Sequence, residues 1–287
     1  MIDVTVVILT KNEEINLPDC LRSLEGFAKR VLVVDSCSTD NTVDVARKMG
    51  AEVLIHPFEN HARQFNWALD NADIITKWTF KLDADERLTP ELIRELEELT
   101  RLHDNDDVNG IAMEAWLYFL GRRISHGCHN KRKLMLFKTG IGRIEDRWID
   151  EHTVLSCGSS VYAKNRFIHY DFKDMTHWVS KMNWYATREM HDYFDFVSGK
   201  ASAIKGEDPT ICATRKKKFG FYYRLPMFFR CWLLFVYNYI FRLGFLDGKE
   251  GFVYNYMYHR WYRTLVDAKI LEQMKYPKEF DDAGNLK

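Results

Sequence analysis

This chain has few features that would tie it to an oxidising compartment or to nucleic acid. It has 287 residues and six cysteines but no CxxC pair, and a chain of this length does not need disulfides to fold, so we interpret the cysteines as reduced thiols of a cytoplasmic protein. The 41 basic and 41 acidic residues cancel, which argues against nucleic acid as a dedicated partner. No basic stretch followed by an apolar run begins the chain, so no signal peptide is expected.

Two glycine-rich phosphate-binding motifs are also missing from the first hundred residues. Neither GxGxxG, typical of dinucleotide-binding folds, nor GxxxxGK[ST], typical of P-loop kinases, occurs there. A nucleotide bound by this half must therefore be held in another way.

The first hundred residues contain four apolar runs that alternate with amphipathic helical patterns. The runs are VTVVILT (4–10), RVLVVDS (30–36), AEVLIH (51–56) and KWTFKLDADE (77–86). Helical patterns follow each run, with Ser38 or Asp40 as the expected N-cap of the second helix and Thr89 as that of the fourth. This alternation predicts an α/β fold, in which a parallel sheet carries helices on both faces.

Acidic side chains lie at the predicted carboxyl ends of two strands. Asp35 ends the second run, and Asp83 and Asp85 end the fourth. Ligands bind at this edge of such sheets. Side chains two residues apart on an extended strand point the same way, so Asp83 and Asp85 should present paired carboxylates, which Glu86 need not join. Paired carboxylates with oxygen ligands favour Mg²⁺ or Mn²⁺ shared with a phosphate, whereas helix capping and solvated loop charge are the alternative.

Three segments carry a resemblance to a known family. VVILTKNEE (6–14), VLVVDSCSTDNT (31–42) and LDADE (82–86), in this order and spacing, resemble the N-terminal half of the family 2 inverting glycosyltransferases, which have the GT-A fold. The bacterial lipopolysaccharide-core β-glucosyltransferase type shares LDADE and a late segment similar to RLGFLDGKEGF (242–252). The DxD motif alone is a weak signal, but the ordered set is specific, and the resemblance covers most of the chain.

The resemblance implies roles for the residues that match the motifs. Thr10 and Glu13 would border the base and ribose of a nucleotide-sugar donor, expected to be UDP-linked, and Asp35 would accept a hydrogen bond from uracil. Asp83 would approach the ribose and the metal, and Asp85 would ligate the Mg²⁺ or Mn²⁺ that bridges the diphosphate. A divalent cation would offset the charge that develops on the leaving group.

The next candidates lie in a basic loop. GIAMEAWLYFLG (110–121) and KLMLFKTG (133–140) are predicted strands joined by HNKRK (129–133). Relatives place an arginine near here that faces the donor phosphates. Lys131, Arg132 and Lys133 remain open for that role, and a solvated loop is the alternative.

Inversion requires a base that removes the proton of the acceptor hydroxyl. The segment DRWIDEHTV (146–154) offers Glu151, which matches the family's glutamate by position, with Asp150 as the alternative. Trp148 would either stack on a sugar ring of the acceptor or fill the core.

Three further residues match the family pattern. His169 would be a third metal ligand or a structural histidine. Lys181 and Tyr185, one helical turn apart, resemble a Lys-x-x-x-Tyr pattern and would line the acceptor cleft.

The C-terminal region differs in composition from the rest. Between residues 215 and 263 there are ten basic residues and two acidic ones, a local charge of +8, interleaved with aromatics. The longest charge-free run, 231–241, is shorter than the roughly 20 apolar residues that span a bilayer. We expect a helical segment that lies on an anionic membrane surface. The alternative is a helical hairpin packed on the catalytic domain or on a second copy of the chain.

Together these observations predict a domain order and a function. The ranges are a nucleotide-sugar-binding half (1–103), an acceptor-side half (104–200) and the basic aromatic region (201–287). The expected function is metal-dependent inverting transfer of a sugar to a glycolipid or polysaccharide hydroxyl, at the cytoplasmic face of the bacterial inner membrane. The alternatives are a nucleotidyltransferase, although TKNEE (10–14) is not the glycine-rich loop such enzymes use, and a membrane-bound scaffold without turnover.

Overall fold

The computed structural model describes residues 1–128, 132–145, 151–170, 173–199 and 218–279, and these form two compact units. The sheet unit comprises the described residues up to 170 except 119–128. The helical unit comprises 119–128, 173–199 and 218–279. These units do not follow the predicted ranges, because the long helix that begins at Met175 belongs with the C-terminal helices.

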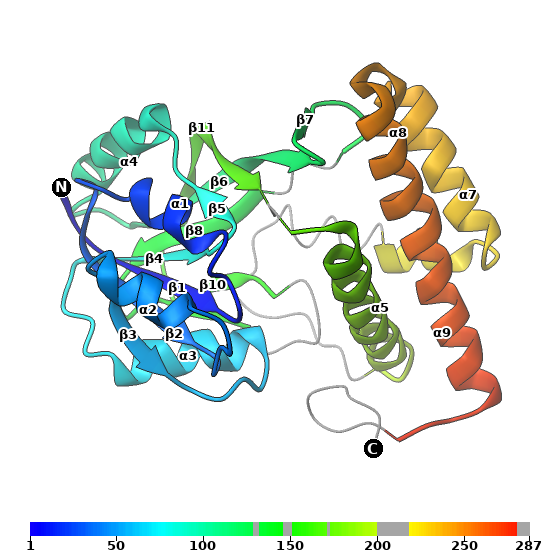
Figure 1. Ribbon diagram of the computed structural model, residues 1–287, viewed down its shortest axis with the longest axis horizontal. Helices are drawn as coiled ribbons and strands as arrows, with labels where there is room; N and C mark the ends of the chain where they lie inside the picture. The colour runs from blue at the N-terminus through cyan, green and yellow to red at the C-terminus, as the bar shows by residue number, and fades with distance from the viewer. Residues whose placement is uncertain (129–131, 146–150, 171–172, 200–217, 280–287) are drawn as a thin grey trace. The chain divides into compact units, whose positions relative to one another are not determined.

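The first four strands confirm the predicted parallel sheet. They are β1 (Ile2–Thr10), β2 (Ala28–Asp35), β3 (Glu52–Ile55) and β4 (Trp78–Asp83). Their order is β3-β2-β1-β4, with every pair parallel (Figure 1). In this register Thr10 lies beside Asp35, and Leu9 lies beside Asp83. The two predicted acidic strand ends therefore reach the same edge of the sheet.

Beyond β4 the sheet becomes mixed, so "mostly parallel" describes only part of it. The later strands are β5 (Glu86–Arg87), β6 (Val108–Phe119), β7 (Arg122–Ile124), β8 (Arg132–Lys138), β9 (Gly142–Ile144), β10 (Thr153–Leu155) and β11 (Ser159–Tyr170). Strand β8 runs antiparallel between β4 and β6, β11 runs parallel to β6, and the short β5 pairs antiparallel with β11. Strands β9 and β10 form a separate antiparallel ribbon.

Helices cover both faces of the sheet, as predicted. The helices of this unit are α1 (Leu17–Arg22), α2 (Thr42–Lys48), α3 (His61–Asn71) and α4 (Pro90–Leu102). Helices α1, α2 and α4 pack on one face around Phe80 and Leu82, whereas α3 packs on the other around Phe65 and Phe137. Each of these four side chains is fully buried, and such burial contributes about 1.5–3 kcal/mol per side chain.

Local signals predicted one helix start well and another less well. The Thr89 hydroxyl accepts a hydrogen bond of 3.2 Å from Leu92 N–H at the start of α4, as expected of an N-cap. Helix α2 has Asn41 at the N-cap position, without a side-chain cap bond. The Asp40 carboxylate nevertheless accepts from Thr42 N–H at 3.0 Å, while Ser38 turns toward the site at the end of β2.

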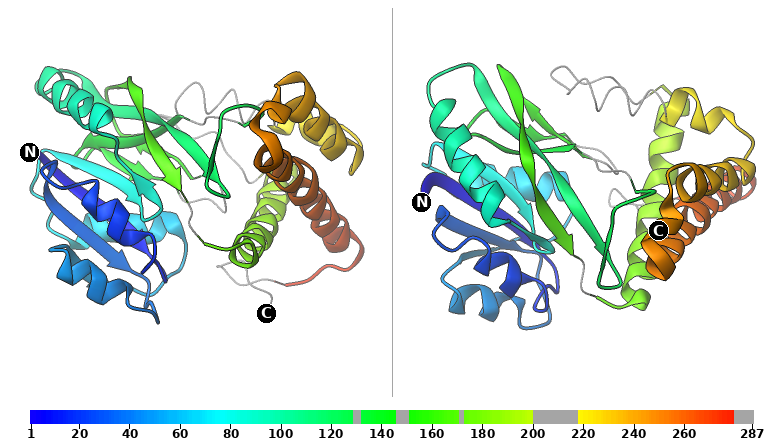
Figure 2. Two further views of the ribbon diagram at one scale, coloured as in Figure 1. Left: turned by 45° about the horizontal axis from the view of Figure 1, so that its top comes forward. Right: turned by 90° about the horizontal axis from the view of Figure 1, so that it is seen from above.

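The helical unit is built from one long helix and a helical hairpin. It contains α5 (Met175–Val197), α7 (Phe229–Val236), which continues as a π-helix over Tyr237–Phe241, and α8 (Gly248–Asn255), which continues through a second π-helix (Tyr256–Tyr262) into α9 (Arg263–Lys275). Helices α5 and α9 lie side by side (Figure 2), with Met182, Ala186 and Met190 packed against Val266 and Ile270. Each helix in the described ranges falls short of the length or apolar character that crossing a bilayer requires.

Part of the +8 charge counted from the sequence is neutralised inside this unit. Arg230 pairs with Asp267 at 2.5 Å, and both side chains are 1% exposed. Arg263 and Lys218 both meet the buried Glu189, at 2.5 and 3.0 Å. The acids come from α5 and α9, outside the range over which the charge was counted. The sequence segment is basic, but three of its cations do not contribute free positive charge to the surface.

The loop after β6 is held by the C-terminal helices. The Asp247 carboxylate accepts from the backbone N–H groups of Ser125 and His126, at 2.8 and 2.7 Å. Gly127 has φ +63°, and a Cβ there would lie 2.6 Å from the Asn238 carbonyl oxygen and 3.0 Å from the Gly244 Cα. Only a glycine fits this approach. The segment 242–252 that resembles a family motif therefore serves, in part, to hold this loop.

Candidate active site

Asp35 lies buried at the end of β2, the strand end at which it was predicted, and beside Thr10. Its Oδ2 accepts hydrogen bonds from the Thr10 hydroxyl at 2.9 Å and the Ser38 hydroxyl at 2.5 Å. Its Oδ1 accepts from Ser38 N–H at 2.8 Å. Since a carboxylate offers about four lone-pair sites, one acceptor site is left for a ligand N–H.

The loops after β1 and β2 are tied to each other. Lys11 donates to the carbonyl oxygens of Ser36 and Cys37, and Glu13 N–H donates to the Thr42 hydroxyl at 2.7 Å. The Glu13 carboxylate accepts from Asn16 at 2.9 Å. Because the two loops share these bonds, Glu13 and Asp35 are held in a fixed relation at the sheet edge.

Gln64 supports this edge and was not predicted. It is fully buried on α3, and its amide donates to the Ser36 hydroxyl at 3.1 Å and to the His56 carbonyl oxygen at 3.0 Å. The His56 ring stacks on Trp67 with centroids 4.1 Å apart. The sequence contained a signal for this role, because the glutamine lies among the apolar residues 62, 65 and 68 on one helix face. A buried amide is normally hydrogen-bonded, so a supporting role could have been inferred.

The Asp83–Asp85 stretch differs in shape from the prediction. Strand β4 ends at Asp83, and Ala84 and Asp85 form a turn, so the extended-chain alternation that we used does not apply there. The negative charge of Asp85 acts to raise the pKa of Asp83, so the two carboxylates influence each other across this turn.

Glu86 takes part in this cluster, contrary to our expectation that it need not. Its side chain is 0% exposed, and its carboxylate accepts from Asp83 N–H at 3.0 Å and from the Lys133 ammonium at 2.8 Å. Glu86 thus closes the turn from within and joins β5 to β8.

Lys133 is the member of the basic loop that meets the acids. It begins, with Arg132, the strand β8 rather than lying in a loop, and its ammonium lies 3.7 Å from Asp83 Oδ2. Arg132 instead pairs with Glu114 at 3.1 Å. Lys131 lies outside the described residues.

The charges in this cluster shift one another's protonation. Burial acts to lower the pKa of Lys133, but the carboxylates of Glu86 and Asp83 raise it well above its usual value. Burial acts to raise the pKa of Asp83, but the ammonium groups of Lys81 and Lys133 bring it below its usual value. Lys133 is therefore a cation, and Asp83 an anion, at neutral pH.

His169 lies beside Asp85, where the resemblance placed a third ligand. Its Nε2 is 3.2 Å from Asp85 Oδ2, and β11 pairs it in register with Glu86. Burial acts to lower the pKa of His169, but the charge and hydrogen bond of Asp85 raise it above its usual value. The structure thus pairs His169 with Asp85, whereas Asp83 is joined to Glu86 and Lys133.

The predicted base lies on a different part of the sheet unit. Glu151 is half-buried and precedes β10. At this end of the ribbon, Glu145 N–H donates to the His152 carbonyl oxygen at 3.0 Å, and His152 N–H donates to the Glu145 carboxylate at 3.1 Å. The Asn66 side chain on α3 binds both polar backbone atoms of Ile144 and so fastens the ribbon to the sheet unit. Asp150 and Trp148 lie outside the described residues.

The predicted acceptor residues belong to the helical unit. Lys181 and Tyr185 lie one turn apart on α5, and both are half-buried. Tyr185 packs against the core formed by α5 and α9. Their role at an acceptor cleft stays a prediction.

Solved structures show a distant likeness to this chain. A glucosyl-3-phosphoglycerate synthase from Mycobacterium tuberculosis, solved with Mn²⁺, UDP and glucosyl-3-phosphoglycerate, is 21% identical with a TM-score of 0.33, over 39% of this chain and 43% of that one. TarS of S. aureus is 16% identical with a TM-score of 0.41, over 66% of this chain and 40% of that one. This chain spans less than half the length of either, and at these scores the likeness has no bearing on the site.

Sequence relatives and a family model are more informative. An "uncharacterized glycosyltransferase" of Rickettsia typhi is 26% identical over 66% of this chain and 67% of the relative. The lipopolysaccharide core biosynthesis glycosyltransferase LpsC of Rhizobium meliloti is 25% identical over 96% of this chain and 95% of the relative. The model of glycosyl transferase family 2 matches residues 5–149, which include most of β1, all of β2 to β4 and the acidic turn. Since that match extends over half of the chain, the protein belongs to glycosyl transferase family 2.

Proposed function

We propose that this protein transfers a sugar from a nucleotide diphosphate donor, expected to be UDP-linked, to a hydroxyl of a lipid-linked or polymeric saccharide, with inversion at the anomeric carbon. LpsC, which aligns over 96% of this chain, is named for the biosynthesis of the lipopolysaccharide core, and we extend that acceptor class to this chain.

The observation that carries the proposal is the convergence of Asp35 with the Asp83–Asp85 turn at one edge of the sheet. Asp35 retains one acceptor site for a base N–H, and Asp83 and Asp85 present anionic oxygen where a diphosphate would bind. Lys133 and Lys81 add positive charge beside them. Donor recognition and neutralisation of the leaving group can therefore be performed by neighbouring residues.

The residues present fit a divalent cation that is shared with the donor. Among the described residues no three acidic, histidine or cysteine side chains are grouped as a ready-made metal site. Mg²⁺ and Mn²⁺ need few protein ligands when phosphate and water complete the shell. Asp85 and Asp83 would hold the ion, and His169 would join only after losing its proton. When bound, the cation would supply charge neutralisation of the departing diphosphate.

We assign proton removal from the acceptor to Glu151. Replacing Glu151 by glutamine keeps its shape and removes its basicity, so turnover should fall by roughly 10²- to 10⁴-fold. Donor binding should remain nearly unchanged, because Asp35 and the acidic turn are untouched. Initial-rate kinetics together with calorimetric titration of UDP would measure the two effects separately.

Asp150→Asn is the matched control for this assignment. If only the Asp150 variant loses turnover, the base is Asp150 and the inverting mechanism stands. Small losses in both variants would place the base elsewhere.

A donor screen tests the proposed reaction as a whole. UDP-sugars, with other nucleotide sugars as comparison, would be incubated with Mg²⁺ or Mn²⁺, and nucleoside diphosphate release would be measured. A parallel incubation with UTP and a sugar 1-phosphate tests the alternative, because a nucleotidyltransferase would release pyrophosphate from UTP as it forms the UDP-sugar. Absence of all release, with any acceptor saccharide added, would favour a scaffold without turnover.

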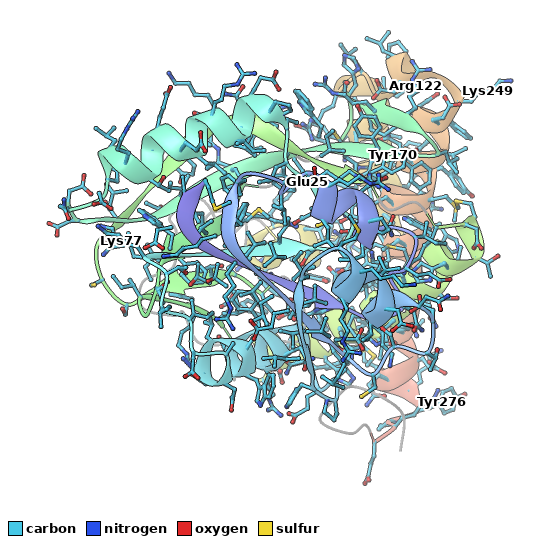
Figure 3. The ribbon with its side chains drawn as sticks, turned by 60° about the vertical axis from the view of Figure 1, so that its left-hand side comes forward. Glu25, Lys77, Arg122, Tyr170, Lys249 and Tyr276 are labelled. Atoms are coloured by element: carbon cyan, nitrogen blue, oxygen red, sulfur yellow. The ribbon has the colours of Figure 1, made fainter. Side chains whose placement is uncertain are left out.

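We also propose a peripheral membrane location, but through a smaller surface than the whole basic segment 215–263. Because Lys218, Arg230 and Arg263 are engaged internally, we assign membrane contact to the hairpin tip, defined as residues 240–249. Its exposed apolar residues are Ile240, Phe241, Leu243, Phe245 and Leu246. Lys249 is exposed on the same tip and extends outward from the helical unit (Figure 3). Apolar residues flanked by cations are suited to the headgroup layer of an anionic bilayer.

Phe241→Ser combined with Leu246→Ser should release the protein from anionic vesicles. Each buried side chain contributes about 1.5–3 kcal/mol, so partitioning should fall by about 10²-fold or more. Co-sedimentation with vesicles of anionic and of neutral lipid measures this partitioning. High salt should weaken the binding of the wild type to anionic vesicles without abolishing it. Tyr276→Ser, at an exposed site beyond α9, is the control. Wild-type protein that remains in the supernatant but elutes as a dimer would refute the membrane surface in favour of a second copy.

A further inference from the structure

A pocket of about 460 Å³ opens beside the acidic turn, in a place that no motif indicated. It belongs wholly to the sheet unit, and its lining residues are Ile15, Asp19, Arg87, Tyr118, Ile168 and Tyr170. Tyr118 and Tyr170 lie at the carboxyl ends of the parallel strands β6 and β11, the edge at which such sheets bind ligands. The volume lies within the range usual for small-molecule sites.

The charged residues that line the pocket are Arg87 and Asp19, which pair with each other. Arg87 is 16% exposed at its side chain, and its guanidinium lies 2.9 Å from the Asp19 carboxylate. Asp19 also pairs with Arg22, so one carboxylate is shared by two guanidinium groups, and the pocket offers Arg87 as a hydrogen-bond donor and Asp19 as an acceptor. A ligand with hydroxyl groups can accept from Arg87 and donate to Asp19.

The apolar groups are aromatic ring faces. The rings of Tyr118 and Tyr170 have centroids 5.3 Å apart with planes inclined at 60°, and the Arg87 guanidinium lies 5.1 Å from the Tyr170 centroid. Tyr170, which is half-buried, is labelled in Figure 3. Ring faces next to a hydrogen-bonding pair suit a ligand with an apolar C–H face and a polar rim, which is the surface chemistry of a sugar ring.

The pocket is joined directly to the predicted metal ligands. Tyr170 N–H donates to the Asp85 carbonyl oxygen at 2.8 Å, and Arg87 directly follows Glu86 in β5. His169, which meets Asp85, lies between the lining residues Ile168 and Tyr170. Since successive strand residues face opposite sides, the pocket lies across this edge of the sheet from the His169 side chain.

We propose that this pocket binds a sugar ring of the acceptor that is remote from the reacting hydroxyl. The ring packs on Tyr118 and Tyr170, one hydroxyl donates to Asp19, and another accepts from Arg87. The inference rests on the proposed transfer to a saccharide acceptor and adds a binding site to it. Binding of a non-reacting part of the substrate can be used to position the reacting part.

The test is saturation-transfer NMR of the full chain with a neutral disaccharide, maltose or lactose, in the absence of donor. Ile15→Glu places a charge at the rim, and since Ile15 is 56% exposed the fold should be kept. Sugar signals should fall at least about fivefold in this variant, and the acceptor KM should rise while donor hydrolysis without acceptor stays unchanged. Ile75→Glu, at an exposed site in another loop, is the matched control and should behave as wild type.

A second pair of variants separates ring stacking from folding. Tyr170→Phe keeps the ring and should retain the sugar signals, whereas Tyr170→Ala should lose them. Sugar signals that are absent from wild type, or unchanged in Ile15→Glu, would overturn the proposal. Octyl glucoside serves as a second ligand in the same measurement. If it received saturation only on its alkyl protons and none on its sugar ring, the proposal would also be overturned. Wild-type protein that binds sugar but releases no nucleotide would refute the transfer reaction and leave the pocket standing as a sugar site.

Discussion

Replacement of Asp85 by asparagine is expected to lower sugar transfer by at least about 10²- to 10³-fold, the loss typical when one preorganised electrostatic group is removed from a transition state. The substitution keeps the size of the side chain and removes the charge that would hold a divalent cation. The fold should be retained, because the Asp85 carbonyl oxygen still accepts from Tyr170 N–H. Donor turnover in Mg²⁺ and in Mn²⁺ measures the loss of sugar transfer. Circular dichroism of the variant tests whether the fold is retained.

Asp70→Asn makes the same chemical change at an exposed carboxylate that pairs with Arg143. This control should have normal turnover, since Asp70 lies at the end of α3 away from the acidic turn. Near-normal turnover of the Asp85 variant in either cation would show that the carboxylate holds no metal and that the leaving group is stabilised by other residues, of which Lys133 is the first to examine.

A second large effect is expected in the helical unit, where Asp267→Asn should lower the free energy of unfolding by about 3–5 kcal/mol. The change leaves the Arg230 charge buried without its counter-ion. It also weakens the bonds that Asp267 accepts from Phe228 N–H at 2.7 Å and from the Arg230 Nε at 3.0 Å. Urea unfolding followed by tryptophan fluorescence gives the change in midpoint.

Glu272→Gln, on the same helix, breaks an exposed pair with Lys278 and should have little effect. The double variant Arg230→Met with Asp267→Leu removes both buried charges and should be more stable than Asp267→Asn alone, because no unpaired charge remains. Equal midpoints for Asp267→Asn and Glu272→Gln would mean that the buried pair contributes no more to stability than a surface one.

The features that the sequence predicted are those that depend on neighbours along the chain. The four strands and the cap at Thr89 follow from apolar periodicity and local hydrogen bonding, and the structure has them at nearly the predicted residues. The position of Asp35 and Asp83 at the same edge also follows, because parallel strands end at a common edge.

The features that it did not predict depend on residues distant in sequence. Glu86 lies in the turn motif, but its partner Lys133 comes from a strand 47 residues later. The turn at Ala84 and Asp85 could not be read from an alternation rule that assumes an extended chain. Local charge was misleading for the same reason, since the acids that neutralise Lys218 and Arg230 lie on other helices.

The bonds between Asp247 and the loop after β6 limit how this protein can be divided or recombined. The family match over residues 5–149 contains residues 119–128, which belong to the helical unit, so the matched region is not a self-sufficient module. His259 Nε2 lies 3.0 Å from the Gly127 carbonyl oxygen and adds a second contact from far along the chain. A chimera that joins the sheet unit of one relative to the C-terminal helices of another would therefore have to exchange the loop and residues 238–259 together. A substitution in one of these two segments therefore restricts which residues the other can accept. Among diverged relatives, we expect substitutions in the two segments to occur in pairs.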